Sequence, residues 1–215
     1  MANTELSFEL KGIMPLLMHA DDIAAADKLM AWRKDPANKN VSVAGDDRSP
    51  AWTWYTYCYS DGTNIAYPQE NIMVALRQAG AQLILKKQKT FKEISQSGLL
   101  IMSEFCEFYA NGKQVPITAL RAIEKKPFAE QADAVQKLGF KLFVKRAKIG
   151  TSKHVRVRPR FDNWSIKGRI QILANEITPE ILTQLFNLAG RVGLGDWRPG
   201  CKTPGPFGMF TATVK

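Results

Sequence analysis

The sequence is poor in the residues that most often build disulfide frameworks and metal sites. Its three cysteines, Cys58, Cys106 and Cys201, lie far apart and form no C-x-x-C pair. An odd, scattered set of cysteines is typical of reduced thiols and argues against a disulfide framework or a zinc site. With only two histidines, His19 and His154, a histidine-based metal cage is not expected either. The sequence therefore predicts neither a metal nor a cofactor.

Long apolar runs are missing as well. The longest, at positions 13–18 and 98–102, are far too short to cross a bilayer. The first residues are neither basic nor followed by a long apolar stretch, so a signal peptide is not expected. Together these absences predict a cytoplasmic protein with no membrane partner. The hydrophobic fraction of 45% and charged fraction of 23% are those of an ordinary globular protein.

What the sequence has in excess is positive charge. The net charge is +10, and positions 141–169 carry ten basic residues against the single acid Asp162, an excess of nine. The ten are Lys141, Lys145, Arg146, Lys148, Lys153, Arg156, Arg158, Arg160, Lys167 and Arg169. Charge that is focused in this way is typical of a protein that binds a polyanion such as nucleic acid.

The segment 153–160 alternates as a β-strand does. His154, Arg156, Arg158 and Arg160 share one parity, so they are expected in a row on one face, roughly 6.6 Å apart. This spacing is close to the phosphate repeat of an extended single strand, and arginine can grip phosphate with two hydrogen bonds. The alternative is a solvated outer face, which usually mixes both signs of charge. We therefore expect this row, with Lys167 and Arg169 on the next strand, to contact phosphates.

Other residues extend the predicted interface. We expect Lys145, Arg146, Lys148 and Lys153 to lengthen the phosphate path, and Arg191, Trp197 and Arg198 to form a second wall. Unpaired bases stack on aromatic side chains, for which Trp164 and Trp197 are the candidates, although the protein core is the more usual place for each. The lysines at 86, 87, 89 and 92 form a smaller cluster. They could bind a polyanion or complement the dipole of a preceding helix.

The hydrophobic pattern predicts an α+β domain spanning 1–215. Alternating or β-branched segments predict strands, and apolar stripes at helical spacing predict helices. The expected strands are 5–11, 52–59 with 65–67 as a hairpin, 99–109 with 113–117 as another, 141–146, 153–160, 165–173 and 207–214; helices are expected at 68–83, within 118–138 and after the Thr178 cap. Without insertions at 19–67 and 110–152, the order predicts a ferredoxin-like (RRM-like) antiparallel sheet backed by two helices, with inserted β-hairpins.

Three motifs carry a resemblance to a known superfamily. A helix, a glycine-rich stretch and the closing segment 205–210 (GPFGMF) resemble the C-terminal signature of the repeat-associated mysterious protein (RAMP) superfamily. The segments 12–19 (GIMPLLMH) and 67–77 (YPQENIMVALR) are similar to that superfamily's first strand and helix opening. The resemblance implies a ferredoxin-like, RNA-binding protein of the kind found in CRISPR effector complexes. The ending 193–199 (GLGDWRP) also resembles small phage-encoded proteins.

The same resemblance implies a competing function. Some members cut RNA with an acid and a metal ion, for which Asp21 or Asp22 would serve, and others cut it without metal through histidine, for which His19 or His154 would serve. An acid before a helical segment is, however, usually an N-terminal cap. The glycine-rich stretch 190–200 follows a helix and lacks G-K-[ST], which argues against NTP hydrolysis.

The expected function is therefore non-enzymatic binding of single-stranded DNA or RNA, with no catalytic residues. Side-by-side assembly along the strand, as a homo-oligomer or a larger nucleoprotein, is implied by the resemblance, and the aromatic segment 52–59 could form the subunit contact. One alternative is an RNA endonuclease of the same superfamily. The other is a phage assembly or adaptor protein whose basic face meets an acidic protein. Salt dependence of nucleic-acid binding would distinguish the adaptor from the first function.

Overall fold

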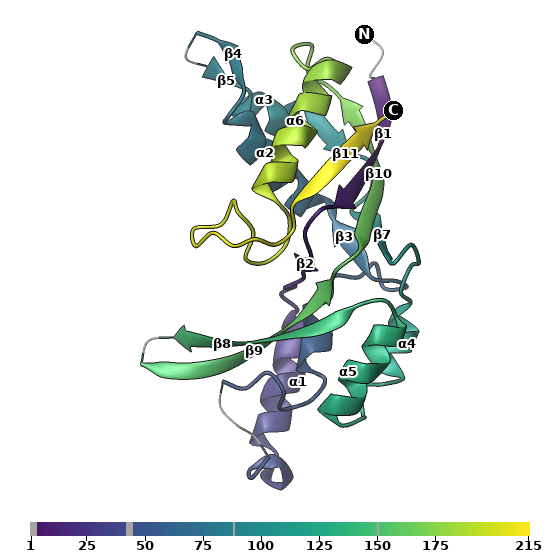
Figure 1. Ribbon diagram of the computed structural model, residues 1–215, viewed down its shortest axis with the longest axis vertical. Coiled ribbons are helices and arrows are strands. Elements are labelled where there is room, and N and C mark those ends of the chain that lie inside the picture. Colours follow the sequence, from purple (N-terminus) through teal and green to yellow (C-terminus); the bar gives the residue numbers. More distant parts are fainter. Residues whose placement is uncertain (1–3, 42–44, 88, 150) are drawn as a thin grey trace. The chain divides into compact units, whose positions relative to one another are not determined.

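A computed structural model describes residues 4–41, 45–87, 89–149 and 151–215 (Figure 1). The chain forms two compact units. The first unit comprises Met1–Leu17, Ala66–Gln114 and Asp162–Lys215, and the second comprises Met18–Ile65 and Val115–Phe161. The sequence had predicted insertions at 19–67 and 110–152. Each unit is described by itself below.

The first unit is built around a six-stranded antiparallel sheet. Its strand order is β11-β1-β10-β7-β3, and the short strand β6 also pairs with β10. The strands are β1 (Thr4–Gly12), β3 (Ala66–Pro68), β6 (Leu99–Ile101), β7 (Phe105–Ala110), β10 (Trp164–Ile172) and β11 (Phe210–Val214); β2 (Leu16–Leu17) follows β1. The expected α+β class with antiparallel sheets is therefore confirmed.

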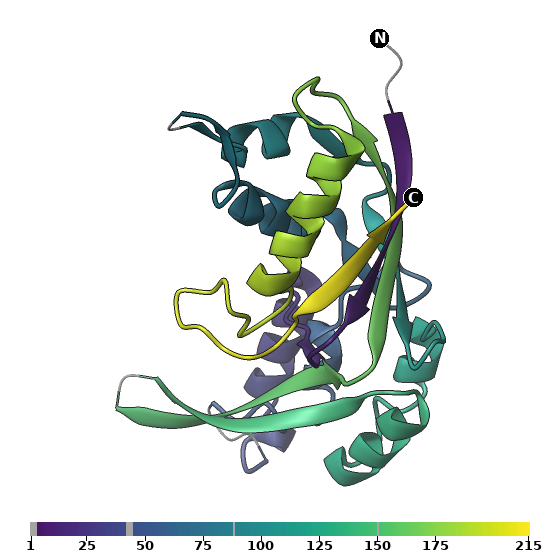
Figure 2. The ribbon, with the colours of Figure 1, turned by 45° about the horizontal axis from the view of Figure 1, so that its top comes forward.

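The helices of the first unit are α2 (Gln69–Gly80), α3 (Lys92–Ser97) and α6 (Pro179–Val192), with a small hairpin of β4 (Ile84–Lys86) and β5 (Lys89–Thr90) between α2 and α3. Helix α6 lies over one face of the sheet (Figure 2). The predicted start of this helix is confirmed, because the Thr178 hydroxyl accepts a hydrogen bond from the Ile181 N–H and Pro179 occupies the first turn.

Alternation along β1 and β10 places apolar residues on the face that α6 covers. The ring centroids of Phe8 and Phe186 lie 5.1 Å apart, which joins β1 to α6. Gly168 lies opposite Phe8 in the strand register, and a Cβ there would come within 2.6 Å of the phenyl ring. A glycine at this point of β10 therefore leaves the space that the Phe8 ring fills.

The second unit combines helices with one long hairpin. Its elements are α1 (Ile23–Lys34), the 3-10 helices η1 (Pro36–Asn38) and η2 (Thr53–Tyr57), α4 (Ile117–Arg121), α5 (Phe128–Lys137), β8 (Lys141–Ile149) and β9 (Ser152–Phe161). The core contains Trp54 of η2 against Phe140, which in turn stacks on Phe161 at the end of β9. The Trp54 indole N–H donates to the Gln131 side chain of α5 at 2.7 Å, so these two buried polar groups satisfy each other.

Two predicted hairpins are corrected by the structure. The aromatic segment 52–59 is not a strand; it contains η2, in which the Thr53 and Thr56 hydroxyls donate to the carbonyls three residues before them. Trp52 and Trp54 are buried, whereas Tyr55, Tyr57 and Tyr59 are half-buried, and the subunit contact stays a prediction. The segment 113–117 forms only isolated bridges before α4 begins at Ile117. Local β propensity was overridden by packing in both places.

Within the described parts of the chain, none of the helices is both long and apolar enough to span a bilayer.

Candidate nucleic-acid interface

The hairpin β8–β9 carries most of the predicted interface. Residues 141–160 include eight lysines and arginines and lack aspartate and glutamate altogether. The strands pair without interruption from Lys141 opposite Arg160 to Ile149 opposite Ser152. At roughly 3.3 Å per residue, nine paired positions make a ribbon about 30 Å long. The expected strands 141–146 and 153–160 are confirmed and extend further toward the turn.

The register places basic residues on both faces of this ribbon. Directly opposed residues share a face, so Lys145 and Arg156 lie on one side, and Lys148 and Lys153 on the other. Arg146 joins the second side opposite Val155. The sequence predicted a basic row on one face only, whereas the hairpin carries basic residues on its other face as well.

Exposure increases toward the turn. Lys145, Arg146, Lys148 and Lys153 are all exposed, whereas Val157 and Pro159 near the other end are buried. In both ribbon views the turn end of β8–β9 extends beyond α1 and α5 of its own unit (Figures 1 and 2). These four side chains, with the partly exposed Arg156, form what we call the basic tip.

The base of the hairpin is held by the loop that contains Asp47. The Asp47 carboxylate accepts hydrogen bonds from Arg156 at 3.0 Å, from Arg158 at 3.1 Å and from the Val157 N–H at 3.2 Å. Backbone bonds from Asp47 N–H to the Val155 carbonyl and from Val155 N–H to the Gly45 carbonyl add this loop to the edge of β9. The carboxylate is nearly inaccessible, and the two guanidinium groups share its single negative charge.

Arg158 lies at the centre of this buried cluster. Its guanidinium stacks over the Tyr57 ring at 4.2 Å and lies 3.3 Å from His19 Nε2. The His19 ring meets Tyr57 edge-on, with 5.0 Å between centroids. Burial raises the pKa of the Tyr57 phenol above its ordinary value, and the nearby Asp47 charge adds to this effect. The Tyr57 phenol therefore stays protonated and uncharged beside the Arg158 guanidinium.

Arg158 is therefore not the exposed phosphate contact that strand parity predicted. It is only 9% exposed, and its charge is matched by Asp47. Arg156 keeps 34% of its side chain exposed while paired to the same carboxylate, and Arg160 is half-buried. His154 is half-buried as well, with its Nδ1 atom enclosed near Gly45. Asp47 escaped the sequence reasoning because charge was counted only over positions 141–169; the adjacent acids Asp46 and Asp47 were the available signal.

The basic residues of β10 belong to a face that mixes charges. Arg169 forms an ion pair with Glu5 at 3.0 Å, and Lys167 lies 3.9 Å from Glu9, both acids being on the neighbouring strand β1. Lys167 also lies over the Tyr109 ring at 5.0 Å. The expectation that this face carries only positive charge is wrong, because β1 supplies acids that strand 165–173 does not reveal. This arrangement is typical of an ordinary solvated sheet face.

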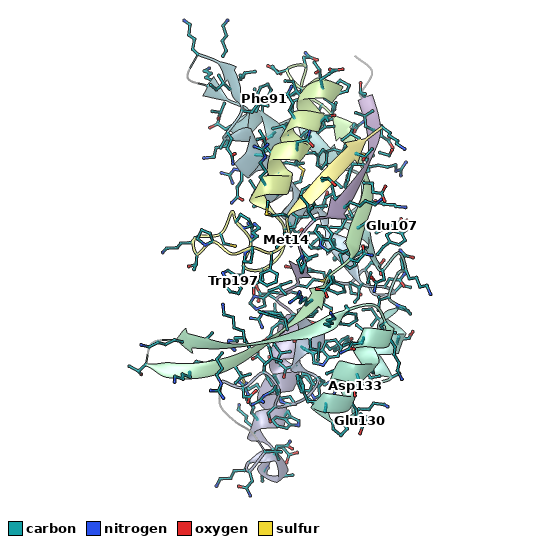
Figure 3. The ribbon with its side chains drawn as sticks, viewed as in Figure 1. Met14, Phe91, Glu107, Glu130, Asp133 and Trp197 are labelled. Atoms are coloured by element: carbon teal, nitrogen blue, oxygen red, sulfur yellow. The ribbon has the colours of Figure 1, made fainter. Side chains whose placement is uncertain are left out.

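The two predicted stacking residues have different surroundings. Trp164 is buried, stacks on Phe108, and donates its indole N–H to the Met14 carbonyl at 2.9 Å. It is a core residue, and the prediction that it stacks on bases is wrong. Trp197 is partly exposed on the loop after α6 (Figure 3), with its ring 5.5 Å from that of Phe207.

The arginines near Trp197 also lie in the first unit, away in sequence from the hairpin. Arg198 donates to the Gly195 carbonyl at 3.2 Å, and Arg191 is exposed in the last turn of α6. Gly195 and Gly208 have positive φ, and a Cβ at Gly208 would come within 1.8 Å of the Leu194 carbonyl oxygen. The glycine-rich stretch is thus a closely packed backbone turn. The second wall itself stays a prediction.

The candidate catalytic acids have structural surroundings. Asp22 is the N-cap of α1, where its carboxylate accepts from the Ala24 and Ala25 N–H groups, as expected for an acid before a helix. Asp21 is exposed beside it. Among the described residues, no group of three or more histidines, cysteines and acids is placed to hold a metal ion.

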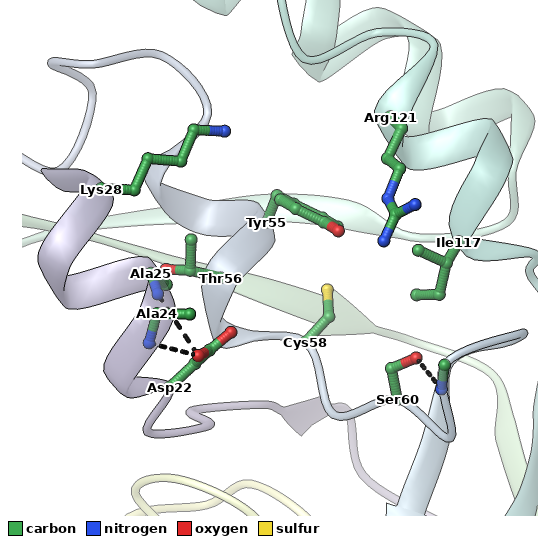
Figure 4. A pocket seen from close by; sticks show the side chains of 11 residues that line it. Asp22, Ala24, Ala25, Lys28, Tyr55, Thr56, Cys58, Ser60, Ile117 and Arg121 are labelled. Carbon is green, nitrogen blue, oxygen red and sulfur yellow. Dashed lines mark hydrogen bonds between the residues drawn. The ribbon is translucent and has the colours of Figure 1, made fainter. Parts of the chain in front are cut away.

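A cavity of about 360 Å³ opens between α1, η2 and α4 (Figure 4). Tyr55 and Cys58 line it from η2 and its C-cap, Arg121 lines it from α4, and Lys28 lines it from α1. Burial raises the pKa of the Cys58 thiol, so this wall presents a protonated sulfur and not a thiolate. Lys28 is paired with Glu124. The lining offers polar contacts but lacks an activated nucleophile among these groups.

Comparison with known proteins adds no family assignment. The sequence matches no protein-family model, and no curated protein matches it.

Proposed function

We propose that this protein binds single-stranded nucleic acid, without catalysing a reaction, through the basic tip of the β8–β9 hairpin. The observation that carries the proposal is a ribbon of eight basic residues and no acids whose exposed cations gather toward its turn. Phosphate contacts come from Lys145, Arg146, Lys148, Lys153 and Arg156. Residues 141–160 contain neither aspartate nor glutamate, and the acid that pairs with Arg156 is Asp47 of the adjoining loop.

The preference for single strands follows from the shape of the ribbon. Side chains on one face repeat about every 6.6 Å along the strand, which suits successive phosphates of an extended backbone. Arg156 is held by Asp47 with part of its guanidinium exposed, so it is oriented before any ligand arrives. A guanidinium that is already ordered loses less entropy on binding than a free side chain.

The strand order supports a ferredoxin-like interpretation of the first unit. In that plan the four strands lie in the order 4-1-3-2 and two helices cover one face. If β1, β7, β10 and β11 are the four strands and α2 and α6 the helices, the observed order β11-β1-β10-β7 corresponds to it. We propose on this basis, and on the resemblance of the glycine-rich C-terminal segment, a relationship to the RAMP superfamily.

The test is fluorescence-anisotropy binding to labelled single-stranded and duplex DNA and RNA at low and moderate salt. The variant is Arg146→Ala/Lys148→Ala/Lys153→Ala, because all three side chains are exposed and none is part of the Asp47 cluster. The matched control is Lys86→Ala/Lys87→Ala/Lys89→Ala, which removes the same charge from exposed lysines of the first unit.

We expect the hairpin variant to weaken single-strand binding by at least about tenfold, and the control by much less. Equal losses in the two variants would mean that net charge, or the lysine cluster at 86–92 as much as the hairpin, drives binding. Absence of binding by the wild type would overturn the proposal and leave the adaptor function, in which the tip meets an acidic protein. Shortening of the oligonucleotides during incubation would instead favour the endonuclease function.

A further inference from the structure

A groove of the second unit is lined by aromatic side chains from three separate segments. Its volume is about 520 Å³, and it is bordered by Trp32 in the last turn of α1, Trp52 at the start of η2 and Phe128 at the start of α5. Small-molecule sites typically have volumes of roughly 300–1,000 Å³ and aromatic linings. Trp32 and Phe128 are only half-buried, whereas Trp54 of the same unit is fully enclosed. We call this surface the aromatic groove.

The Arg48 guanidinium also borders the aromatic groove and is fixed in place. Its Nε atom donates to one oxygen of the Asp46 carboxylate at 3.0 Å, and its Nη2 atom donates to the other at 2.5 Å. The same contact holds the pKa of Asp46 below its usual range, so the pair stays ionised. Half of the Arg48 side chain is nevertheless exposed. A planar guanidinium that is already ordered offers a further surface on which a base can stack.

The charged residues that line the aromatic groove are three cations and one acid, namely Arg48, Lys125, Lys126 and Glu124. Glu124 is paired with Lys28 of α1, and Lys126 lies 3.7 Å from Glu130. Lys125 is exposed. The excess of positive charge is small, so it favours an anionic ligand only weakly. Stacking on the rings therefore has to supply most of the affinity.

The aromatic groove adjoins the loop that braces β9. The Asp47 carboxylate accepts from Arg156 of the basic tip at 3.0 Å, and the Asp47 N–H donates to the Val155 carbonyl of β9 at 2.9 Å. The next residue in the chain, Arg48, borders the groove. Because consecutive Cα atoms are about 3.8 Å apart, the groove begins close to the last cation of the basic tip. A strand that is bound at the tip can therefore continue into the groove.

We propose that the aromatic groove holds an unpaired base of the single strand that is bound at the basic tip. The base stacks on Trp32, Phe128 or the Arg48 guanidinium, and Lys125 contacts the phosphate beside it. This inference rests on the proposed function and adds a contact that depends on bases to one that depends on phosphates. Bases in a duplex are already paired and stacked, so the groove favours single strands. A peptide would use the same rings without the ordered Arg48 or the link to the hairpin, so a nucleotide is the better-supported occupant.

Photo-cross-linking of the wild-type protein is the first test, because it needs no substitution. The probes are single-stranded oligonucleotides that carry 5-iodouracil at one position each, a base that couples to an aromatic ring stacked against it. Mass spectrometry of the digested protein locates the adduct. We expect adducts on Trp32, Trp52 or Phe128. Adducts found only on other residues, or none at any position of an oligonucleotide that binds, would overturn the proposal.

Substitutions on two separate walls of the groove measure its contribution. Trp32→Ala and Phe128→Ala should each weaken binding of a single strand by about tenfold, as expected for the loss of one stacked base, with the salt dependence unchanged. Trp32→Phe keeps a ring and should retain most of the affinity. The matched control is Tyr109→Ala, at a half-buried aromatic residue of β7 in the first unit, and it should bind as the wild type does. Unchanged affinity in both groove variants would overturn the proposal and favour a peptide as the occupant.

An abasic strand separates this inference from the proposed function. It keeps the phosphates of the matched oligonucleotide and lacks the bases, so the basic tip should still bind it. The wild type should bind the abasic strand at least about tenfold more weakly than the matched strand, and Trp32→Ala should then cause no further loss. Equal affinity of the wild type for the two strands would overturn the groove contact and leave the basic tip in place. Absence of binding to either strand would overturn the proposed function, and this inference with it.

Discussion

The Asp47 carboxylate holds the Arg158 guanidinium at 3.1 Å although the two residues are 111 positions apart in the sequence. Both side chains are nearly excluded from solvent. The same carboxylate accepts from the Val157 N–H, so one acid joins the loop 45–48 to the middle of β9. The contact braces the part of the hairpin where Arg158 is structural, whereas nearer the turn Arg146, Lys148 and Lys153 are exposed.

Removing the charge of Asp47 should destabilise the second unit. In Asp47→Asn the Arg158 cation stays buried without a counter-ion, a change that typically costs about 3–5 kcal/mol. The control is Glu5→Gln, which breaks the exposed pair with Arg169 and should cost less than about 1 kcal/mol. Urea unfolding followed by fluorescence measures both. Equally small losses of unfolding free energy in the two variants would show that Asp47 is not essential for the stability of the second unit.

The basic tip should determine how binding depends on salt. For single strands the slope of log K against log salt is about −0.7 for each phosphate contact. Removing Arg146, Lys148 and Lys153 together should therefore make the slope less steep by about 2. Binding titrations at a series of salt concentrations measure it. A weakened affinity with an unchanged slope would mean that these cations do not contact phosphates.

Gly208 should tolerate no side chain, because it fills a gap between backbone segments. Its φ is +74°, its N–H donates to the Pro15 carbonyl at 2.7 Å, and a Cβ would meet the Leu194 carbonyl. Gly62 also has positive φ, but a Cβ there would meet nothing within 4 Å. Gly62→Ala should cost about 1 kcal/mol from backbone conformation alone, and Gly208→Ala clearly more. Thermal unfolding of the two variants separates the cost of a steric clash at Gly208 from the cost of a positive φ, which both positions share. Similar losses of stability in the two variants would contradict this account.

The sequence predicted the elements whose signals are local. The start of α6 is set by Thr178 and Pro179, and the β8–β9 hairpin by alternation on both sides of its turn. These features depend on neighbours in the chain, which single-sequence patterns contain. The excess of charge in the hairpin was visible for the same reason.

The sequence-based predictions failed where contacts with residues distant in the chain determine burial or secondary structure. Alternation correctly aligned Arg158 with Arg156, but the burial of Arg158 depends on Asp47 and Tyr57, which the pattern of β9 does not contain. In the same way the acids that balance Arg169 lie on β1. The aromatic segment 52–59 has strand-forming residues, yet its packing on α5 favours a 3-10 turn. Propensity yields to tertiary contacts in such cases.

The three cysteines should differ sharply in reactivity, because only a thiolate attacks an alkylating reagent. Burial raises the pKa of the Cys58 thiol, and burial together with the Glu107 charge raises that of Cys106 to about 12. In the folded protein the thiols of Cys58 and Cys106 therefore stay protonated at pH values at which a solvent-exposed thiol is already ionised. Their contribution to stability is present below the ordinary thiol pKa and is lost as the pH rises above it. Cys106 is buried, whereas Cys58 and Cys201 are both partly exposed, so the slow reaction expected of Cys58 rests on its raised thiol pKa and not on lack of access.

Iodoacetamide at neutral pH should thus modify Cys201 first and leave Cys58 and Cys106 unmodified until urea unfolds the chain. Peptide mapping by mass spectrometry assigns each site, and Cys201→Ser should abolish the fast phase while leaving the slow one. At about pH 9 the folded protein should still react slowly at Cys58, since this thiol stays protonated. Rapid modification of Cys58 in the folded protein would contradict this account, because it would show that the thiol lining the cavity beside α1 ionises readily.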